Sequence, residues 1–273
     1  GGVGLLNAAI GLGGLAGAIA ALGLAGGRRL TTVFAIALVG WGLPLVFIIG
    51  EAYFLKGGVH VRGSISAYYH SSMRDTFIAG LCIIGFFLAT YLSGEGKTLD
   101  FALSLVAGLA VLGVAFFPTT RPHLLPEAPR CGATPMPDGC SPIQQQFGET
   151  LIAGFHFIFA ATFILSLAVM CFVFASTKRE KPEPSAMRKT LRFCGGVIIG
   201  AVLWAAIGGY LKLTIWELTP LYLAEVISVW AFGAAWLLKA RTLKEAYGPT
   251  RRGLQPPTGV QREEPQQTAS RTG

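Results

Sequence analysis

The sequence predicts an all-α integral membrane protein, a bundle of six transmembrane helices with a seventh span in question at the N-terminus. Of its 273 residues, 52% are hydrophobic and only 13% are charged, whereas a soluble domain carries roughly 25% charged residues. The mean hydropathy is +0.57. Six separate apolar runs reach about 20 residues, the length needed to cross a bilayer core as a helix. The composition thus excludes an ordinary water-soluble domain and a disordered chain.

The six predicted spans form one transmembrane domain, residues 28–240. No span alternates apolar and polar residues with a period of two, so helices are predicted rather than the strands of a barrel. The spans cover residues 30–55, 74–93, 99–117, 150–176, 191–211 and 219–238. After them, residues 241–273 are rich in Pro, Gln, Gly and charge, which predicts a disordered cytoplasmic tail.

Residues 1–27 carry no charge, and ten of them are glycine. Because glycine weakens a helix by about 1 kcal/mol relative to alanine, insertion of this segment into a bilayer is marginal. No basic region precedes the segment, so a secretory signal peptide fits poorly. Two interpretations stay open here: an additional span, or a Gly/Ala-rich apolar leader.

Basic residues predict the orientation of the spans. Fifteen of the 22 Lys and Arg residues flank the spans on one side, three lie at span ends, and four lie in loops on the other side. Cationic residues are retained on the cytoplasmic side, so the C-terminus is predicted to be cytoplasmic. The same placement accounts for the net charge of +8. We therefore expect membrane lipids, and not nucleic acid, as partners.

Cysteine placement is consistent with this orientation. Cys131 and Cys140 lie in the longest predicted outer loop, residues 118–149, where an oxidising environment permits a disulfide between them. The alternative is a pair of free or metal-binding thiols. The other three, Cys82, Cys171 and Cys194, fall inside predicted spans and are expected to pack as small apolar side chains.

Small residues recur at close spacing within the spans, which allows helix backbones to approach one another. The pairs are Gly80 and Gly85, Gly108 and Gly113, and Gly196 and Gly200. The last pair is a GxxxG motif. Packing within one chain is the expected use of these residues, and a homo-oligomer built through the motif is the alternative.

Ionisable residues inside spans are costly in lipid and therefore indicate function. They are few here and fall at one predicted depth, near the outer surface: Glu51, Arg74, Asp75, His156 and Glu225. A dense polar stretch, Ser64-Ile-Ser-Ala-Tyr-Tyr-His-Ser-Ser-Met-Arg-Asp75, directly precedes the second span. Since the helices concerned enter from the same face, we expect an outward-facing polar pocket. Its candidate ligand-binding residues are Ser66, Tyr68, His70, Arg74, Asp75, His156 and Glu225.

Two uses of such a pocket follow from its chemistry. It could bind a small polar ligand or a lipid headgroup, with Arg74 meeting a phosphate or carboxylate and His156 forming a proton-sensitive pair with Glu225. The alternative is structural: Tyr at headgroup level and a snorkelling Arg lock the helices together without a ligand.

Four runs give the chain a resemblance to a known family. They are SISAYYHSSMRDTF, GVAFFPT, GFHFIFAATF and AEVISVWAFGAAWLLK. In these runs the chain resembles a bacterial family of polytopic membrane proteins with no assigned function, over residues 64–239. The resemblance implies six core helices in a bacterial cell membrane and implies no activity.

A second, shorter pattern implies an alternative function. Ser66-x-x-x-His70, with Asp75 nearby, is similar to the first half of the zinc motif in alkaline-ceramidase-like membrane hydrolases. That family takes its other ligands from a late His-x-x-x-His, which this sequence lacks. Since zinc hydrolases need about three protein ligands, the alternative is a zinc hydrolase of lipid-like substrates with His70, His156 and Glu225 on the metal.

Overall fold

The computed structural model describes residues 28–55, 61–90, 98–122, 128–176, 185–215 and 218–247. Apart from one isolated bridge between Ile215 and Leu218, the regular structure of this part is helical. Its elements are α2 (Arg28–Leu55), the 3-10 helix η1 (Ser66–His70), α3 (Arg74–Thr90), α4 (Leu99–Phe116), α5 (Pro142–Phe147), α6 (Glu149–Ser176), α7 (Ser185–Tyr210) and α8 (Pro220–Tyr247). The two interpretations of residues 1–27, and the predicted tail beyond α8, lie outside the described residues.

In the part of the chain that the structure describes, four helices are long and apolar enough to cross a membrane: α4, α6, α7 and the Pro220–Lys239 part of α8. The predicted all-α class is confirmed for the described residues, and the four apolar helices are consistent with a membrane protein. Helix α3 has 17 residues, and the apolar part of α2 with described side chains is Val39–Phe54. Large apolar side chains cover the outer surface of the long helices, which in water would be an aggregation hazard. Examples are Leu109, Phe155, Ile158, Phe193, Leu203 and Ile207.

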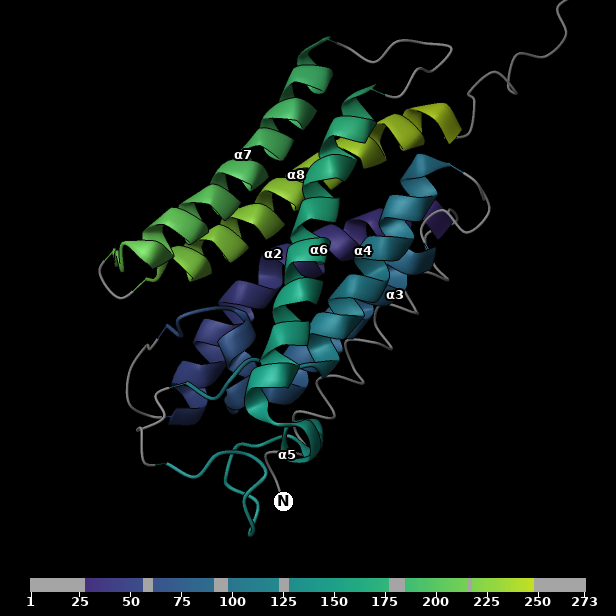
Figure 1. Cartoon of the computed structure of the whole chain (residues 1–273). Helices are drawn as coiled ribbons and strands as arrows, with labels where there is room; N and C mark the ends of the chain where they lie inside the picture. The colour runs from purple at the N-terminus through teal and green to yellow at the C-terminus, as the bar shows by residue number, and fades with distance from the viewer. Residues whose placement is uncertain are drawn as a thin grey trace, which may run out of the picture.

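The six long helices pack as a closed circuit (Figure 1). Each helix from α2 to α8 contacts the next long helix along the chain, and α8 returns to pack against α2. Helix α6 also contacts α8 across the circuit. The described residues of the loops that follow α2, α4 and α7 come together at one end of the bundle, toward the lower left in Figure 1. This end holds the candidate site.

The circuit is closed by a reciprocal contact between α2 and α8. The indole Nε1 of Trp41 donates to the carbonyl oxygen of Trp230 at 3.1 Å, and Nε1 of Trp230 donates to the carbonyl oxygen of Trp41 at 3.3 Å. Gly233 lies one turn further along α8, where any Cβ would collide with the Trp41 ring. Glycine therefore allows the tryptophan of α2 to lie flat against α8.

Glycine also sets the α3–α4 crossing. A Cβ on Gly108 would lie 2.8 Å from the carbonyl oxygen of Gly85 and 2.9 Å from the amide nitrogen of Ala89. The intramolecular packing predicted for Gly196 and Gly200 is wrong, because a Cβ on either residue meets no atom within 4 Å. The GxxxG motif of α7 thus faces outward from the bundle.

We expect Gly108→Ala to destabilise the protein by about 1–3 kcal/mol, because the added methyl group meets backbone atoms that cannot move aside. Gly196→Ala is the matched control. Its methyl group enters open space, so it should leave the melting temperature unchanged or raise it. Thermal unfolding in detergent measures both, and equal melting temperatures for the two variants would contradict the α3–α4 crossing.

Candidate functional site: a polar cavity at one end of the bundle

A cavity of about 720 Å³ lies between α2, α6 and α8 at the loop-rich end of the bundle. Its volume falls within the roughly 300–1,000 Å³ typical of small-molecule sites. Its polar lining consists of Glu51, Arg62, Ser64, Ser66, Thr119, Thr120, His156, Thr219 and Glu225. The three loops at this end each contribute, through Arg62, Thr119 and Thr219. The cavity is therefore assembled from segments far apart in sequence.

An ion pair forms one wall. Arg62 Nε donates to both carboxylate oxygens of Glu51, at 2.8 Å and 3.0 Å, and its Nη2 donates to Oε1. The Glu51 side chain is 1% exposed, at the end of α2. Since a buried carboxylate is costly unless it is paired, this bidentate contact fixes the segment after α2 against that helix.

Glu225, in the second turn of α8, forms the opposite wall. The Ile65 amide donates to its Oε2 at 2.5 Å, and the Ser66 hydroxyl lies 3.4 Å from its Oε1. Among the described residues, no basic side chain pairs with Glu225. Glu225 thus contributes a carboxylate whose neighbours are neutral hydrogen-bond donors.

His156 reaches the cavity from α6. The side chain is 2% exposed, and its Nδ1 lies 2.6 Å from the carbonyl oxygen of Phe117. Because a carbonyl can only accept, Nδ1 carries a hydrogen in this contact. The contact fixes the plane of the imidazole and links α6 to the end of α4.

The structure brings three of the seven predicted site residues to the cavity and places four elsewhere. Ser66, His156 and Glu225 line it. Tyr68 is buried in the core, where its ring stacks on Phe47 with centroids 5.0 Å apart, and burial raises its pKa. The reason is local: a 3-10 helix has three residues per turn, so Ser66 and Tyr68 point to different sides.

His70, Arg74 and Asp75 also lie outside the cavity lining. The ring of His70 is held by the neighbouring loop, with Nε2 2.7 Å from the carbonyl oxygen of Thr119. Arg74 donates to the Tyr69 hydroxyl at 2.7 Å and lies over the Tyr69 ring. Asp75 is exposed. The predicted role of Arg74 in meeting an anion in this pocket is not supported by this placement.

Sequence reasoning missed several cavity residues. Glu51 was expected near the pocket as an acidic residue at the outer end of a predicted span, but nothing in the spacing connected it with Arg62, which counted only as a loop cation. Three threonines of the cavity lie in loops and belong to no recognisable sequence motif: Thr119, Thr120 and Thr219. Only the folded arrangement of the three loops brings them together.

The structure does not assemble the proposed zinc ligand set of His70, His156 and Glu225. Within the described ranges, no group of three or more His, Cys, Asp or Glu side chains could hold a metal ion. Both ring nitrogens of His70 face backbone carbonyl oxygens, of Thr119 and Gly139. The zinc-hydrolase alternative therefore lacks a ligand set in this part of the chain.

Residues between α4 and α5 form part of the cavity wall, through Thr119, Thr120 and Pro122. In this loop a disulfide joins Cys131 to Cys140. Arg121 Nε donates to Glu149 Oε1 at 2.7 Å, and its Nη1 and Nη2 donate to the carbonyl oxygens of Asp138 and Pro129. These contacts hold the segment that carries Thr119 and Thr120 against the start of α6.

Comparisons with protein-family models, with curated proteins and with solved structures find no match for this chain. The family resemblance therefore stays a prediction, and function has to be argued from the geometry of the cavity.

We expect Arg62→Met to lower the free energy of unfolding by about 3 kcal/mol, because it leaves the buried Glu51 carboxylate without its partner. The double variant Glu51→Gln/Arg62→Met should lose much less, since it removes both charges. A double-mutant cycle on denaturant unfolding in detergent measures the coupling. Simple additivity of the two single substitutions would show that the pair contributes nothing to stability.

The stability of the folded protein should depend on pH through His70. Burial lowers the pKa of His70 below its usual 6.5, and this outweighs the two carbonyl oxygens, which favour the imidazolium. The unfolded chain then takes up a proton at a higher pH than the folded chain, so stability falls as the pH drops through 6.5. Melting temperatures measured between about pH 7.5 and pH 5.5 should show this loss. In His70→Gln the loss should be smaller, and an unchanged profile would contradict the pKa direction.

Proposed function

We propose that this chain is a six-span membrane protein whose outward-facing cavity binds a small polar molecule carrying an ammonium group. The molecule is either free in solution or the headgroup of a lipid. The observation that carries the proposal is the cavity of about 720 Å³, lined by Glu51, Arg62, His156 and Glu225 together with several hydroxyl groups.

The topology is supported by the helix circuit. Six long helices follow one another as packed neighbours, and the loops after α2, α4 and α7 share one end. These loops contain the four basic residues of the side poor in Lys and Arg, so the positive-inside rule places this end outside. The C-terminus is then cytoplasmic, and the family resemblance favours a bacterial cytoplasmic membrane.

The charge of the cavity selects the ligand. Two carboxylates and one guanidinium line it, and the guanidinium of Arg62 already donates to Glu51 through Nε and Nη2. Among the described residues Glu225 is left as the acidic group of the lining without a basic partner, and its ionised form carries a negative charge. In a site walled partly by apolar side chains this charge acts over a low dielectric, and it attracts a cation more strongly than it would in water. A phosphate or carboxylate ligand would be repelled.

The test uses ethanolammonium chloride as the cationic probe and sodium acetate as the anionic one, with the purified full chain in detergent. We expect ethanolammonium, and not acetate, to raise the melting temperature in a saturable way. Glu225→Gln should weaken the apparent affinity by tenfold or more, because a hydrogen bond to a charged group contributes about 1.5–3 kcal/mol.

Asp75→Asn is the matched control, since it removes an exposed carboxylate outside the cavity and should bind as the unmodified chain does. Equal stabilisation by acetate would contradict the proposal. So would an unchanged affinity in Glu225→Gln, which would leave Glu225 with a structural role only.

The two sources of the ammonium group are separated in lipid nanodiscs. If the natural ligand is a headgroup, discs of phosphatidylethanolamine should compete with soluble ethanolammonium and weaken its apparent affinity relative to discs of phosphatidylglycerol. If the ligand is a free molecule, the apparent affinity should be the same in both kinds of disc once the lipid surface charge is screened with salt.

A further inference from the structure

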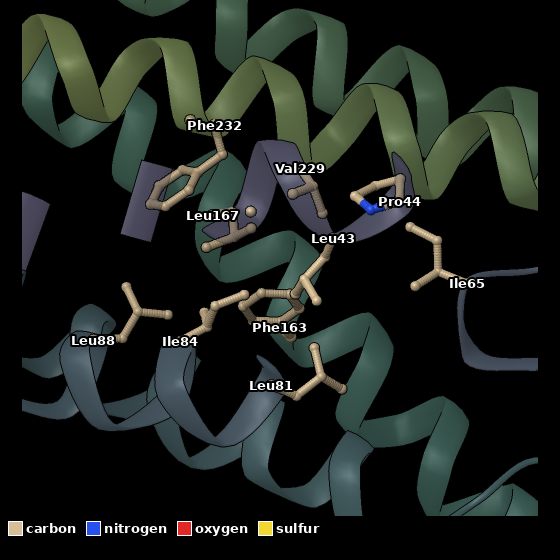
Figure 2. A pocket seen from close by; sticks show the side chains of 12 residues that line it. Leu43, Pro44, Ile65, Leu81, Ile84, Leu88, Phe163, Leu167, Val229 and Phe232 are labelled. Carbon is tan, nitrogen blue, oxygen red and sulfur yellow. The ribbon is translucent and has the colours of Figure 1, made fainter. Parts of the chain in front are cut away.

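A second cavity, apolar and of about 50 Å³, lies deeper in the bundle (Figure 2). Its wall is formed by side chains of α2, α3, α6 and α8, among them Leu43, Ile84, Phe163 and Val229. A space larger than about 10–15 Å³ can hold a water molecule, but a water needs polar partners, which these side chains do not supply. We call this space the apolar chamber.

The apolar chamber continues the polar cavity along the same helix faces. On α8, Glu225 lines the polar cavity and Val229, one turn later, lines the chamber. On α6, Ala160 lines the polar cavity and Phe163 lines the chamber. Four residues of a helix rise about 6 Å, so the chamber begins one turn below the Glu225 carboxylate.

Ile65 forms the end of the apolar chamber nearest the polar cavity, and we call it the partition between the two spaces. Ile65 lines the apolar chamber, while its neighbours Ser64 and Ser66 line the polar cavity. Figure 2 shows Ile65 entering from the loop at one end of the chamber, beside Pro44. The Ile65 amide also donates to Glu225. The residue that partitions the two spaces is therefore bonded to the carboxylate proposed to hold the ligand.

The rim of the polar cavity is partly apolar. Phe157 and Leu221 line it, and their side chains are 55% and 41% exposed. On a helix that faces lipid, such side chains form a contact surface for hydrocarbon. A molecule that is polar at one end and apolar at the other matches both the rim and the two stacked spaces.

We propose that the ligand is an amphiphilic amine, whose ammonium group binds at Glu225 while a short alkyl chain displaces the Ile65 side chain and occupies the apolar chamber. This inference rests on the proposed function for the ammonium site and adds the chemical class of the rest of the ligand. The charged end stays in the polar cavity, because the chamber offers no group that could replace its hydration.

The experiment measures binding of the n-alkylammonium series from methyl to hexyl by titration calorimetry on the full chain in detergent. Each methylene that enters the chamber should raise the affinity about fourfold, the value for burying a methylene group. The gain should stop after the first few carbons, when the chamber of about 50 Å³ is full.

Two variants locate the alkyl chain. Val229→Phe fills the chamber and should abolish the gain with chain length while methylammonium still binds. Ile65→Ala removes the partition but keeps the backbone amide that donates to Glu225, and should increase the gain. Val169→Phe, on the exposed face of α6, is the matched control and should leave the series unchanged. If Val229→Phe fails to fold, Ile84→Phe fills the chamber from α3.

The outcomes separate the two proposals. Methylammonium binding with no dependence on chain length overturns the chamber inference and leaves the ammonium site standing. A dependence that persists in both chamber-filling variants also overturns it, because the chain then lies elsewhere. Failure of methylammonium itself to bind overturns the proposed function.

Discussion

Two carboxylates lie inside an apolar bundle, where each needs hydrogen-bond donors or a basic partner. The site depends on this constraint. Glu51 is held by Arg62, and Glu225 accepts from the Ile65 amide and lies near the Ser66 hydroxyl. Both sets of donors belong to one short segment, residues 62–66. Because Glu51 is on α2 and Glu225 is on α8, this segment binds the first and last helices of the circuit. The Thr219 hydroxyl adds a third contact by donating to the Gly63 carbonyl oxygen.

The segment has two sides with opposite character. Toward the cavity it presents Arg62, Ser64 and Ser66. Toward the core it continues into η1, where Tyr68 stacks on Phe47 of α2. Burial of the aromatic ring holds the segment in the bundle, and the carboxylates fix its register. The polar cavity therefore exists because the same few residues supply apolar contacts on one side and hydrogen-bond donors on the other.

Hydropathy predicted the helices well and their ends less well. The run predicted as 191–211 belongs to α7, which begins earlier at Ser185, and the run 219–238 belongs to α8, which continues to Tyr247. Hydropathy detects only the part of a helix suited to lipid, whereas a helix also continues through charged residues that water can solvate. For the site, the cost of in-span charge identified Glu225 and His156. The same criterion could not identify Arg62, because the sequence of a loop does not show which residue its basic side chain will pair with. It also could not predict the turn that directs Tyr68 and His70 away from the cavity.

The cavity is also the reason we propose a binding role rather than a purely structural one. Polar groups that serve only to join helices gain most when they pack closely around one another, since protein interiors contain few voids larger than a water molecule. Here Glu51 and Arg62 satisfy each other, and Glu225 is satisfied by the loop, yet a space of about 720 Å³ remains between the two walls. Such a space adds nothing to helix packing. Our proposal assigns this space to an exchangeable molecule, with an acidic group on one wall and the apolar chamber beyond Ile65.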